Sequence, residues 1–329
     1  MSKSHNTDVL IIGAGLAGLS AANDLRQAGL KVLVIDKGRG LGGRLAGRRI
    51  GEATFDHGAQ FFTARESRFK AAVERWTEAG VAEQWYSSYP GQPSGHPRYR
   101  GVPTMTAVAK YLATGISVMR ATKVVSIAQH KDKKWLATLD NYDTVVANKL
   151  LITSPVPQTV DLLATGNIAV PKDKQSRLER IQYEACIAVM AVIDRPATIE
   201  YPGAIALENG PIAWISDNLQ KGVSKIPAVT IHASGDFSAQ HLDHDRMKIG
   251  QQLIDAAGPY IGDAKVTEYQ VHGWRYSKPT VVDDAPCMLL SEATDLPVLA
   301  LAGDAFAGPR FEGAVQSGWA AAKALMNAN

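Results

Sequence analysis

The sequence predicts an α/β domain with a parallel sheet, interrupted in the middle of the chain by an α+β insertion. Near the N-terminus, an apolar run at 9–12, a glycine-rich turn, a helical pattern at 16–27 and a second strand pattern at 31–35 follow one another. Continuous apolar runs of this kind are typical of strands buried on both faces of a parallel sheet. Near the C-terminus, a late apolar run at 299–302 ends in Gly-Asp before a helix of small residues. The long stretch between mixes strand and helix patterns, which favours an inserted second domain.

The composition is that of an ordinary globular protein. The chain has 329 residues, 46% of them hydrophobic and 20% charged, with a net charge of +3. That charge is too small for a nucleic-acid surface but favours an anionic small molecule. Cys186 and Cys287 belong to no C-x-x-C, so neither a disulfide framework nor a zinc site is indicated. No segment approaches the ~20 apolar residues of a membrane span, and we expect a cytoplasmic protein with no membrane or nucleic-acid partner.

The first glycine-rich turn, Gly13-x-Gly15-x-x-Gly18, has the spacing of a dinucleotide-binding loop. In such a loop the first glycine makes the turn, the second lets a pyrophosphate approach the backbone, and the third allows close helix–strand packing. The N–H groups of the following helix start favour a phosphate. Asp36 closes the second strand, where its carboxylate can accept hydrogen bonds from both hydroxyls of a ribose. The alternative is a glycine-rich turn that binds no ligand. The expected strand, helix, second strand and acidic residue all accompany the glycines, which favours a dinucleotide-binding loop.

A second loop, "KGRGLGGRLAGRR", follows Asp36 and indicates FAD rather than NAD. NAD dehydrogenases do not need this loop, in which Arg44 can neutralise a phosphate, whereas Arg48 and Arg49 read as solvated. At the other end of the chain, Asp304 can bind the ribityl hydroxyls of a flavin. The helix expected from about Ala314 would direct its positive end at the flavin edge that gains negative charge on reduction.

These motifs resemble the flavin amine oxidase superfamily. The segments "FDHGAQFFTAR", "TIHAS", "HGWRYSKP" and "GPRFEGAVQSG" resemble, more narrowly, bacterial members of the renalase family. The resemblance implies a p-hydroxybenzoate-hydroxylase-like architecture, with a Rossmann-like FAD-binding domain and an inserted substrate domain. It also implies non-covalent FAD and the oxidation of 2- or 6-dihydro isomers of NAD(P)H to β-NAD(P)+, with O2 reduced to hydrogen peroxide. The FAD domain is predicted at 1–75, 101–160 and 272–329, and the substrate domain at 76–100 and 161–271.

The predicted FAD contacts lie at the strand ends and loops of both chain ends. They are Gly13, Gly15, Leu16, Ala17, Gly18, Asp36, Lys37, Arg39, Gly43, Arg44, Gly58, Ala59, Gln60, Phe61, Val124, Gly303, Asp304, Glu312, Gly313, Ala314 and Val315.

Within the insertion we expect helices at 173–181 and 246–256, and strands at 185–193, 212–216 and 228–232. Alternation in the last of these strands places Val229, Ile231 and Ala233 on one face, with Thr230 and His232 on the other.

The predicted catalytic residues are Arg310, His232 and Trp274. Amine oxidases that bind a neutral amine usually have an aromatic residue where Arg310 stands. A cation there would repel a protonated amine by ~1–4 kcal/mol and suit an anionic substrate. The alternatives are an ion pair between Arg310 and Glu312, and structural roles for His232 and Trp274.

Other residues leave further readings open. Trp214 and Tyr276 could line a planar pocket or fill the core. His241 and His244 read as a solvated helix start, and no metal is expected. The rival functions are a flavin oxidase or desaturase acting on an amine, a porphyrinogen or a polyene, and a flavin-binding protein without turnover.

Overall fold

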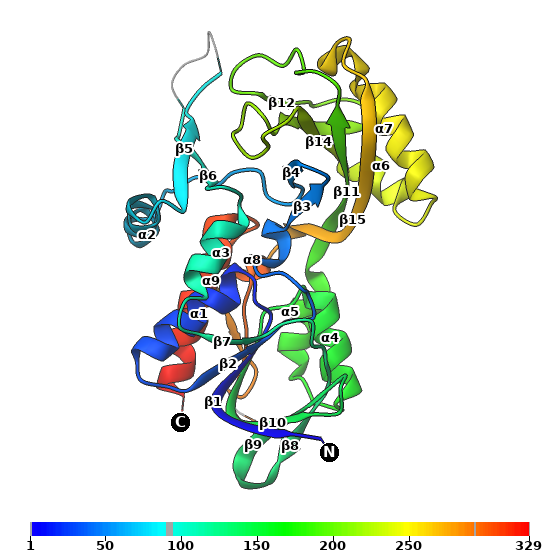
Figure 1. The fold of residues 1–329 in the computed structure, drawn as a ribbon. Coiled ribbons are helices and arrows are strands. Elements are labelled where there is room, and N and C mark those ends of the chain that lie inside the picture. Colours follow the sequence, from blue (N-terminus) through cyan, green and yellow to red (C-terminus); the bar gives the residue numbers. More distant parts are fainter. Residues whose placement is uncertain (1, 90–94, 293, 329) are drawn as a thin grey trace. The chain divides into compact units, whose positions relative to one another are not determined.

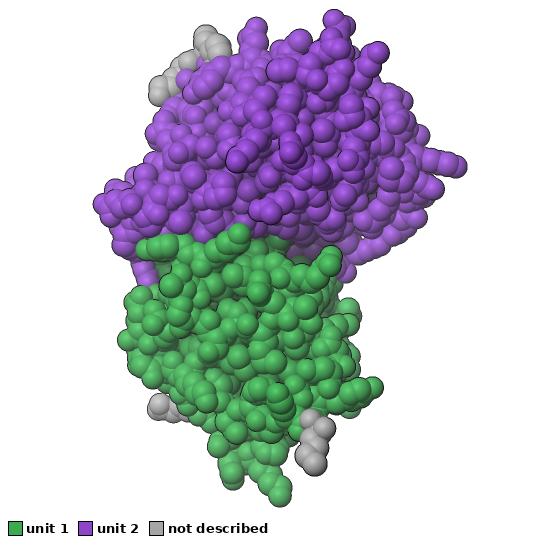
Figure 2. All heavy atoms as spheres, viewed as in Figure 1, with its two compact units in different colours: residues 1–43, 109–182, 279–329 green, residues 44–108, 183–278 purple. Residues whose placement is uncertain are grey.

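The computed structural model describes residues 2–89, 95–292 and 294–328, which form two compact units (Figure 2). Unit 1 consists of Met1–Gly43, Ala109–Gln182 and Pro279–Asn329, and unit 2 of Arg44–Val108 and Tyr183–Lys278. The first unit is therefore assembled from both ends and the middle of the chain.

The sheet of unit 1 has a parallel centre, in the order β17-β10-β1-β2-β7. These strands are β1 (Ser4–Ile12), β2 (Val32–Ile35), β7 (Ser117–Met119), β10 (Thr144–Ile152) and β17 (Leu299–Leu301). Antiparallel pairing extends it through β8 (Val124–His130), β9 (Lys134–Leu139) and β16 (Met288–Leu289). Strand β1 lies between β2 and β10, so the connections leave it in opposite directions. In open α/β sheets, ligands bind at such a switch point, outside the carboxyl ends of the strands.

Two helices from opposite ends of the chain pack together in unit 1. These are α1 (Leu16–Gln27) and α9 (Phe311–Asn327), which run side by side in Figure 1. A Cβ atom on Gly318 of α9 would lie 2.3 Å from the carbonyl oxygen of Ala17. The small residues of α9 therefore allow a contact that brings its first turn into the dinucleotide unit. The other helices with residues in unit 1 are α3 (Thr106–Leu112), α4 (Val156–Thr165), α5 (Lys172–Arg180) and α8 (Asp304–Ala307).

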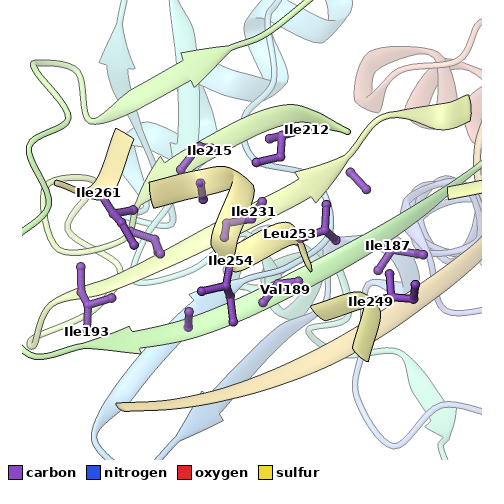
Figure 3. Close-up of a cluster of buried hydrophobic side chains, with 14 of the residues drawn as sticks. Ile187, Val189, Ile193, Ile212, Ile215, Ile231, Ile249, Leu253, Ile254 and Ile261 are labelled. Atoms are coloured by element: carbon purple, nitrogen blue, oxygen red, sulfur yellow. The ribbon is translucent and has the colours of Figure 1, made fainter. Parts of the chain in front are cut away.

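Unit 2 is built on a five-stranded antiparallel sheet in the order β12-β13-β14-β11-β15. Its strands are β11 (Gln182–Ile193), β12 (Ala204–Ala206), β13 (Ile212–Asp217), β14 (Ala228–Ala233) and β15 (Val266–Val281). Helices α6 (Gly235–His241) and α7 (Arg246–Ile261) accompany it. Figure 3 shows aliphatic side chains of β11, β13, β14 and α7 packed into one core. Val229, Ile231 and Ala233 belong to this core, so the predicted alternation of β14 is confirmed.

Two hairpins and a helix complete unit 2. They are β3 (Gly47–Ile50) with β4 (Ala53–Asp56), β5 (Ala82–Tyr86) with β6 (Arg98–Gly101), and α2 (Ser67–Glu78). Phe55 of β4 is fully buried in a cluster with Met190 and Ala228 of the large sheet.

The compact units divide the chain at residues other than those expected for the domains. Residues 44–75, 101–108 and 272–278 lie in unit 2, where the β3–β4 hairpin buries its apolar side chains against β11 and β14. Residues 161–182 lie in unit 1, where Lys174 of α5 donates to the carbonyl of Leu289 and Arg177 pairs with Asp283. The extent of the domain that binds the cofactor remains a prediction.

Most predicted elements are present, with small differences at their ends. The helix at 16–27 has the expected bounds, whereas the helix expected from about 314 begins at Phe311 and the one at 246–256 runs on to Ile261. Among the helices of the described residues, none is both long and apolar enough to cross a membrane.

Candidate functional site

The loop after β1 has the geometry of a phosphate cradle. Gly13 has a φ of +113°, and a Cβ on Gly18 would lie 2.0 Å from its carbonyl oxygen. The hydroxyl of Thr153, which follows β10, donates to the Gly13 carbonyl at 3.2 Å. A Cβ on Gly15, in contrast, would meet no atom within 4 Å. Open space therefore lies over Gly15 at the start of α1, where helix N–H groups and the helix dipole favour a phosphate.

Asp36 is fixed beside this cradle. Its two carboxylate oxygens accept hydrogen bonds from the N–H groups of Ala14 and Gly38, both at 2.6 Å. Each carboxylate oxygen has more than one acceptor site, so both can also accept a ribose hydroxyl. The neighbouring Lys37 is exposed and donates to the side-chain oxygen of Gln158 at 2.9 Å.

The second loop meets the first within unit 1. The N–H of Gly42 donates to the carbonyl of Ala14 at 2.9 Å, and a Cβ on Gly43 would lie 3.8 Å from the Cα of Gly15. Gly42 and Gly43 have φ values of +98° and +54°, which explains why glycines stand there. Arg39 is exposed in the same loop.

At the C-terminal end of β17, Gly303 has a φ of +147° and donates its N–H to the hydroxyl of Ser317 at 2.9 Å. Asp304 is buried at the start of α8. Gly13, Asp36, Thr153 and Gly303 thus all follow parallel strands at the same edge of the sheet.

The first turn of α9 begins at Phe311, with Arg310 as its N-terminal flanking residue. A Cβ on Gly313 would lie 2.2 Å from the carbonyl of Gly308, so the loop before α9 packs tightly against this turn. Glu312 and Ala314 are partly buried and Val315 is buried. Arg310 is exposed. Val124, the remaining predicted contact in unit 1, is buried at the start of β8.

The other predicted cofactor residues lie in unit 2: Arg44 comes just before β3, and Gly58, Ala59, Gln60 and Phe61 lie on the loop that follows β4. The carbonyl of Arg44 accepts from the N–H of Ala59 at 2.9 Å, and a Cβ on Gly58 would lie 2.0 Å from that carbonyl oxygen. The Arg44 guanidinium donates to the carbonyl of Ser277 at 3.1 Å.

The side chain of Gln60 is used to hold this loop. Its amide nitrogen donates to the carbonyls of Asp56 and Gly58 at 2.7 and 3.1 Å. Its oxygen accepts from the hydroxyl of Ser216 at 2.9 Å and from the ammonium of Lys221 at 3.3 Å. Its amide group is therefore fully engaged inside unit 2, and any cofactor contact of Gln60 falls to its backbone.

A buried ion pair that the sequence did not reveal lies at the start of this loop, between Asp56 and Lys221. Asp56 and Lys221 are fully buried, with 2.9 Å between carboxylate oxygen and ammonium nitrogen. The second oxygen of Asp56 accepts from the N–H of Met105 at 2.9 Å, and Thr230 donates to the Asp56 carbonyl at 3.0 Å. Burial lowers the pKa of Lys221, and the charge of Asp56 opposes that shift.

His232 and Trp274, predicted as catalytic, both bind the backbone of the same loop. Each donates a ring N–H to the carbonyl of His57 at 3.1 Å. The His57 ring stacks on Trp274, with ring centres 5.3 Å apart. Burial, aided by the nearby His272 and Arg48, lowers the pKa of His57 to about 3. Burial likewise lowers the pKa of His232 to about 4, so both rings are neutral near pH 7.

An aromatic cluster lies at the far end of this loop; it is defined by Phe61, Trp85, Tyr86, Trp214 and Arg98. Phe61 lies with its ring centre 5.6 Å from Trp214 and 6.5 Å from Tyr86, and Trp85 packs on Tyr86 at 4.9 Å. Trp214, one of the predicted pocket aromatics, is thus next to Phe61.

Two further candidates lie apart from this cluster. Tyr276 packs on Tyr183, with ring centres 5.5 Å apart. His241 and His244 approach each other at 3.1 Å beside Asp245, which caps α7. No group of three or more potential metal ligands occurs in the part of the chain that the structure describes.

The fold and these loops define a dinucleotide-binding flavoprotein, with a Rossmann-like FAD-binding domain and a separate substrate domain built on an antiparallel sheet. Residues 11–76 match the NAD(P)-binding Rossmann-like domain, and residues 75–326 match the family of flavin-containing amine oxidoreductases. The second match covers most of the chain, so the protein belongs to the flavin-containing amine oxidoreductase family. A flavin cofactor follows from that membership.

Curated relatives are similar over parts of the chain. The (S)-6-hydroxynicotine oxidase of Paenarthrobacter nicotinovorans is 27% identical over 184 residues, 54% of this chain and 43% of the relative. The L-amino acid dehydrogenase of Synechocystis sp. is 35% identical over 77 residues, 23% of this chain and 16% of the relative. The chain thus spans less than half of the length of these relatives.

Solved structures are similar over nearly the whole chain. A triple mutant of putrescine oxidase has a TM-score of 0.73 at 15% identity, covering 98% of this chain and 99% of its own. A putative protoporphyrinogen oxidase from Exiguobacterium sp. 255-15 has a TM-score of 0.73 at 13% identity, covering 99% of each chain. At these identities the likeness shows the amine oxidase fold, and the narrower resemblance to renalases stays a prediction.

Proposed function

We propose that the protein is an FAD-dependent oxidase that takes a hydride from 2- or 6-dihydro isomers of NAD(P)H. The dihydro isomer, O2 and a proton would be consumed, and β-NAD(P)+ and hydrogen peroxide would be formed. The observation that carries this substrate class is Arg310, an exposed cation at the start of α9. An anionic dinucleotide suits such a cation, whereas a protonated amine is repelled by it.

The residues of unit 1 fit FAD. The open space over Gly15 admits a pyrophosphate, and the fixed carboxylate of Asp36 has acceptor sites left for ribose hydroxyls. The start of α9 presents N–H groups and the positive end of a helix dipole. When bound, FAD supplies the two-electron acceptor, and we propose that it is held without a covalent bond. Acid precipitation of the protein would then release all of the flavin into the supernatant.

The chain's own residues have positioning rather than acid–base roles in this proposal. Hydride removal from a dihydropyridine leaves an aromatic cation, so no general base is required. The neutral ring of His232 and the indole of Trp274 hold the His57 carbonyl, which fixes the loop that carries Gln60 and Phe61. We propose that His232 and Trp274 position the substrate indirectly, by fixing this loop. Arg310 would attract the anionic substrate.

A flavin oxidase acting on another small molecule is the second candidate, because the family and the fold neighbours point to amine oxidase chemistry. A panel assay of oxygen consumption and peroxide formation separates the two. We expect turnover with 2- or 6-dihydroNAD(P) and none with putrescine or protoporphyrinogen. Turnover with an amine alone would refute the substrate class and keep the flavin oxidase. A protein that binds FAD but consumes no O2 with any donor of the panel would favour a flavin-binding protein without turnover.

A further inference from the structure

Arg98 is held over aromatic rings in the cluster of unit 2. Its guanidinium carbon lies 4.8 Å from the ring centre of Tyr86 and 5.4 Å from that of Phe61. A guanidinium over an aromatic face is attracted by the ring's negative face and loses less solvation than an ammonium would. The side chain is therefore placed by the rings rather than by an ion pair.

No carboxylate neutralises Arg98 in the described chain. Among the described residues, the one hydrogen bond of its side chain is a long one, 3.4 Å, to the carbonyl of Ser87. Residues 90–94, which lie outside the described part, contain no Asp or Glu. Two residues along the same strand, Arg100 is paired with Glu83 at 2.6 Å. The strand thus carries one neutralised arginine and one arginine with donors to spare.

The neighbours of Arg98 cannot provide a negative charge. Burial raises the pKa of the Tyr86 hydroxyl far above its usual range, and a hydrogen bond with Tyr89 adds to that shift. Tyr86 is therefore neutral at any physiological pH. The buried indole N–H of Trp214, whose ring centre lies 5.6 Å from that of Phe61, has no acceptor in the described chain. A buried donor without an acceptor is rare in folded proteins, so the Trp214 indole marks a place where a ligand oxygen could be accepted as a partner.

We propose that this cluster is a recognition site for a planar ring that carries a phosphoryl group, with Arg98 as the residue that binds the phosphoryl oxygens. The partly exposed rings of Phe61, Trp85 and Trp214 offer faces for stacking. Arginine binds phosphate in a bidentate manner, which is why it suits this role better than a lysine. The inference rests on the proposed function, since it assigns a specificity residue for a pyridine nucleotide.

Binding to the FAD-loaded protein tests the inference without any turnover. Nicotinamide mononucleotide and nicotinamide riboside differ only in the phosphate, and quenching of tryptophan fluorescence reports their binding. We expect Arg98→Met to weaken mononucleotide binding by a factor of about 10 to 150, the range for hydrogen bonds to a charged group. The riboside should bind wild type and Arg98→Met alike. Arg98→Lys should recover part of the mononucleotide affinity.

Arg195→Met is the matched control, because it removes an exposed arginine paired with Asp194 in the same unit. Equal mononucleotide affinity in wild type and Arg98→Met, with both thermally stable, would overturn the inference. So would a riboside that binds wild type as tightly as the mononucleotide. Mononucleotide binding that depends on Arg98 in a protein not reduced by dihydroNAD isomers would keep this site and refute only the proposed reaction.

Discussion

The buried pair of Asp56 and Lys221 gives a prediction whose size depends on pH. Replacing Lys221 with Met keeps most of the side-chain volume but leaves the fully buried carboxylate of Asp56 without its cation. A buried carboxylate in that position takes up a proton rather than remaining charged. At pH 7, protonating a carboxyl group whose pKa in an unfolded chain is about 3.9 costs about 4 kcal/mol. We therefore expect Lys221→Met to lower the free energy of unfolding by up to ~4 kcal/mol at pH 7.

The same reasoning fixes how that loss changes with pH. At pH 5 the cost of protonation falls to about 1.5 kcal/mol, so Lys221→Met should recover most of its stability relative to wild type at the same pH. Asp56→Asn leaves a buried ammonium instead, whose deprotonation costs about 4.6 kcal/mol at pH 7 and about 2 kcal/mol at pH 9. The stability of Lys221→Met relative to wild type should therefore rise as the pH falls, whereas that of Asp56→Asn should rise as the pH increases.

Urea unfolding followed by tryptophan fluorescence measures these differences, since Trp85 and Trp214 lie in the same unit as the pair. The double variant Asp56→Asn/Lys221→Met is the control, because it removes both charges, so its loss of stability relative to wild type should change little with pH. A loss below about 1 kcal/mol for Lys221→Met at pH 7, or an equal loss at pH 5 and pH 7, would refute this reasoning.

Further predictions concern the cofactor loop and the histidines. A Cβ on Gly18 would lie 2.0 Å from a backbone oxygen, so Gly18→Ala should be purified without flavin absorbance, while Gly258→Ala, which meets no atom, should stay yellow. Asp36→Ala removes the fixed acceptor and should weaken FAD binding about tenfold or more, measured by titration of the apoprotein; unchanged affinity would remove Asp36 from the site. His57 has a pKa of about 3, far below the ~6.5 of an unfolded chain, so the unfolded state binds the proton first as pH falls. His57 should therefore account for a drop of about 2 kcal/mol in unfolding free energy towards pH 5, and His57→Gln should show a correspondingly smaller total drop.

The sequence was sufficient for the dinucleotide loop because each residue there answers a local requirement. Gly13 needs a positive φ, Gly18 sits against a backbone oxygen, and Asp36 follows a buried strand. The alternation that divides β14 between core and site is likewise local, since Thr230 and His232 face away from the aliphatic core. Patterns of this kind can be predicted from sequence because they depend on only a few neighbouring residues.

The parts that could not be predicted depend on contacts between distant segments. Lys221 is followed by Gly222, and this part of the sequence has the pattern of an exposed turn. Lys221 is nevertheless buried, because it pairs with Asp56 of the distant strand β4. The domain boundaries depend on the β3–β4 hairpin packing against β11 and β14, which no local pattern announces. Thr153 had a usable signal, because it follows an apolar run that forms a parallel strand beside β1. Arg98 and Arg100 look alike in sequence, and only the pairing of Arg100 with Glu83 distinguishes them.

Anaerobic mixing of the FAD-loaded protein with 2- and 6-dihydroNAD tests the proposed function most directly. The account predicts that the flavin absorbance bleaches within milliseconds to seconds, that β-NAD+ forms, and that admitting air restores the colour with release of hydrogen peroxide. A flavin that stays oxidised with both isomers while an amine such as putrescine bleaches it would contradict the account.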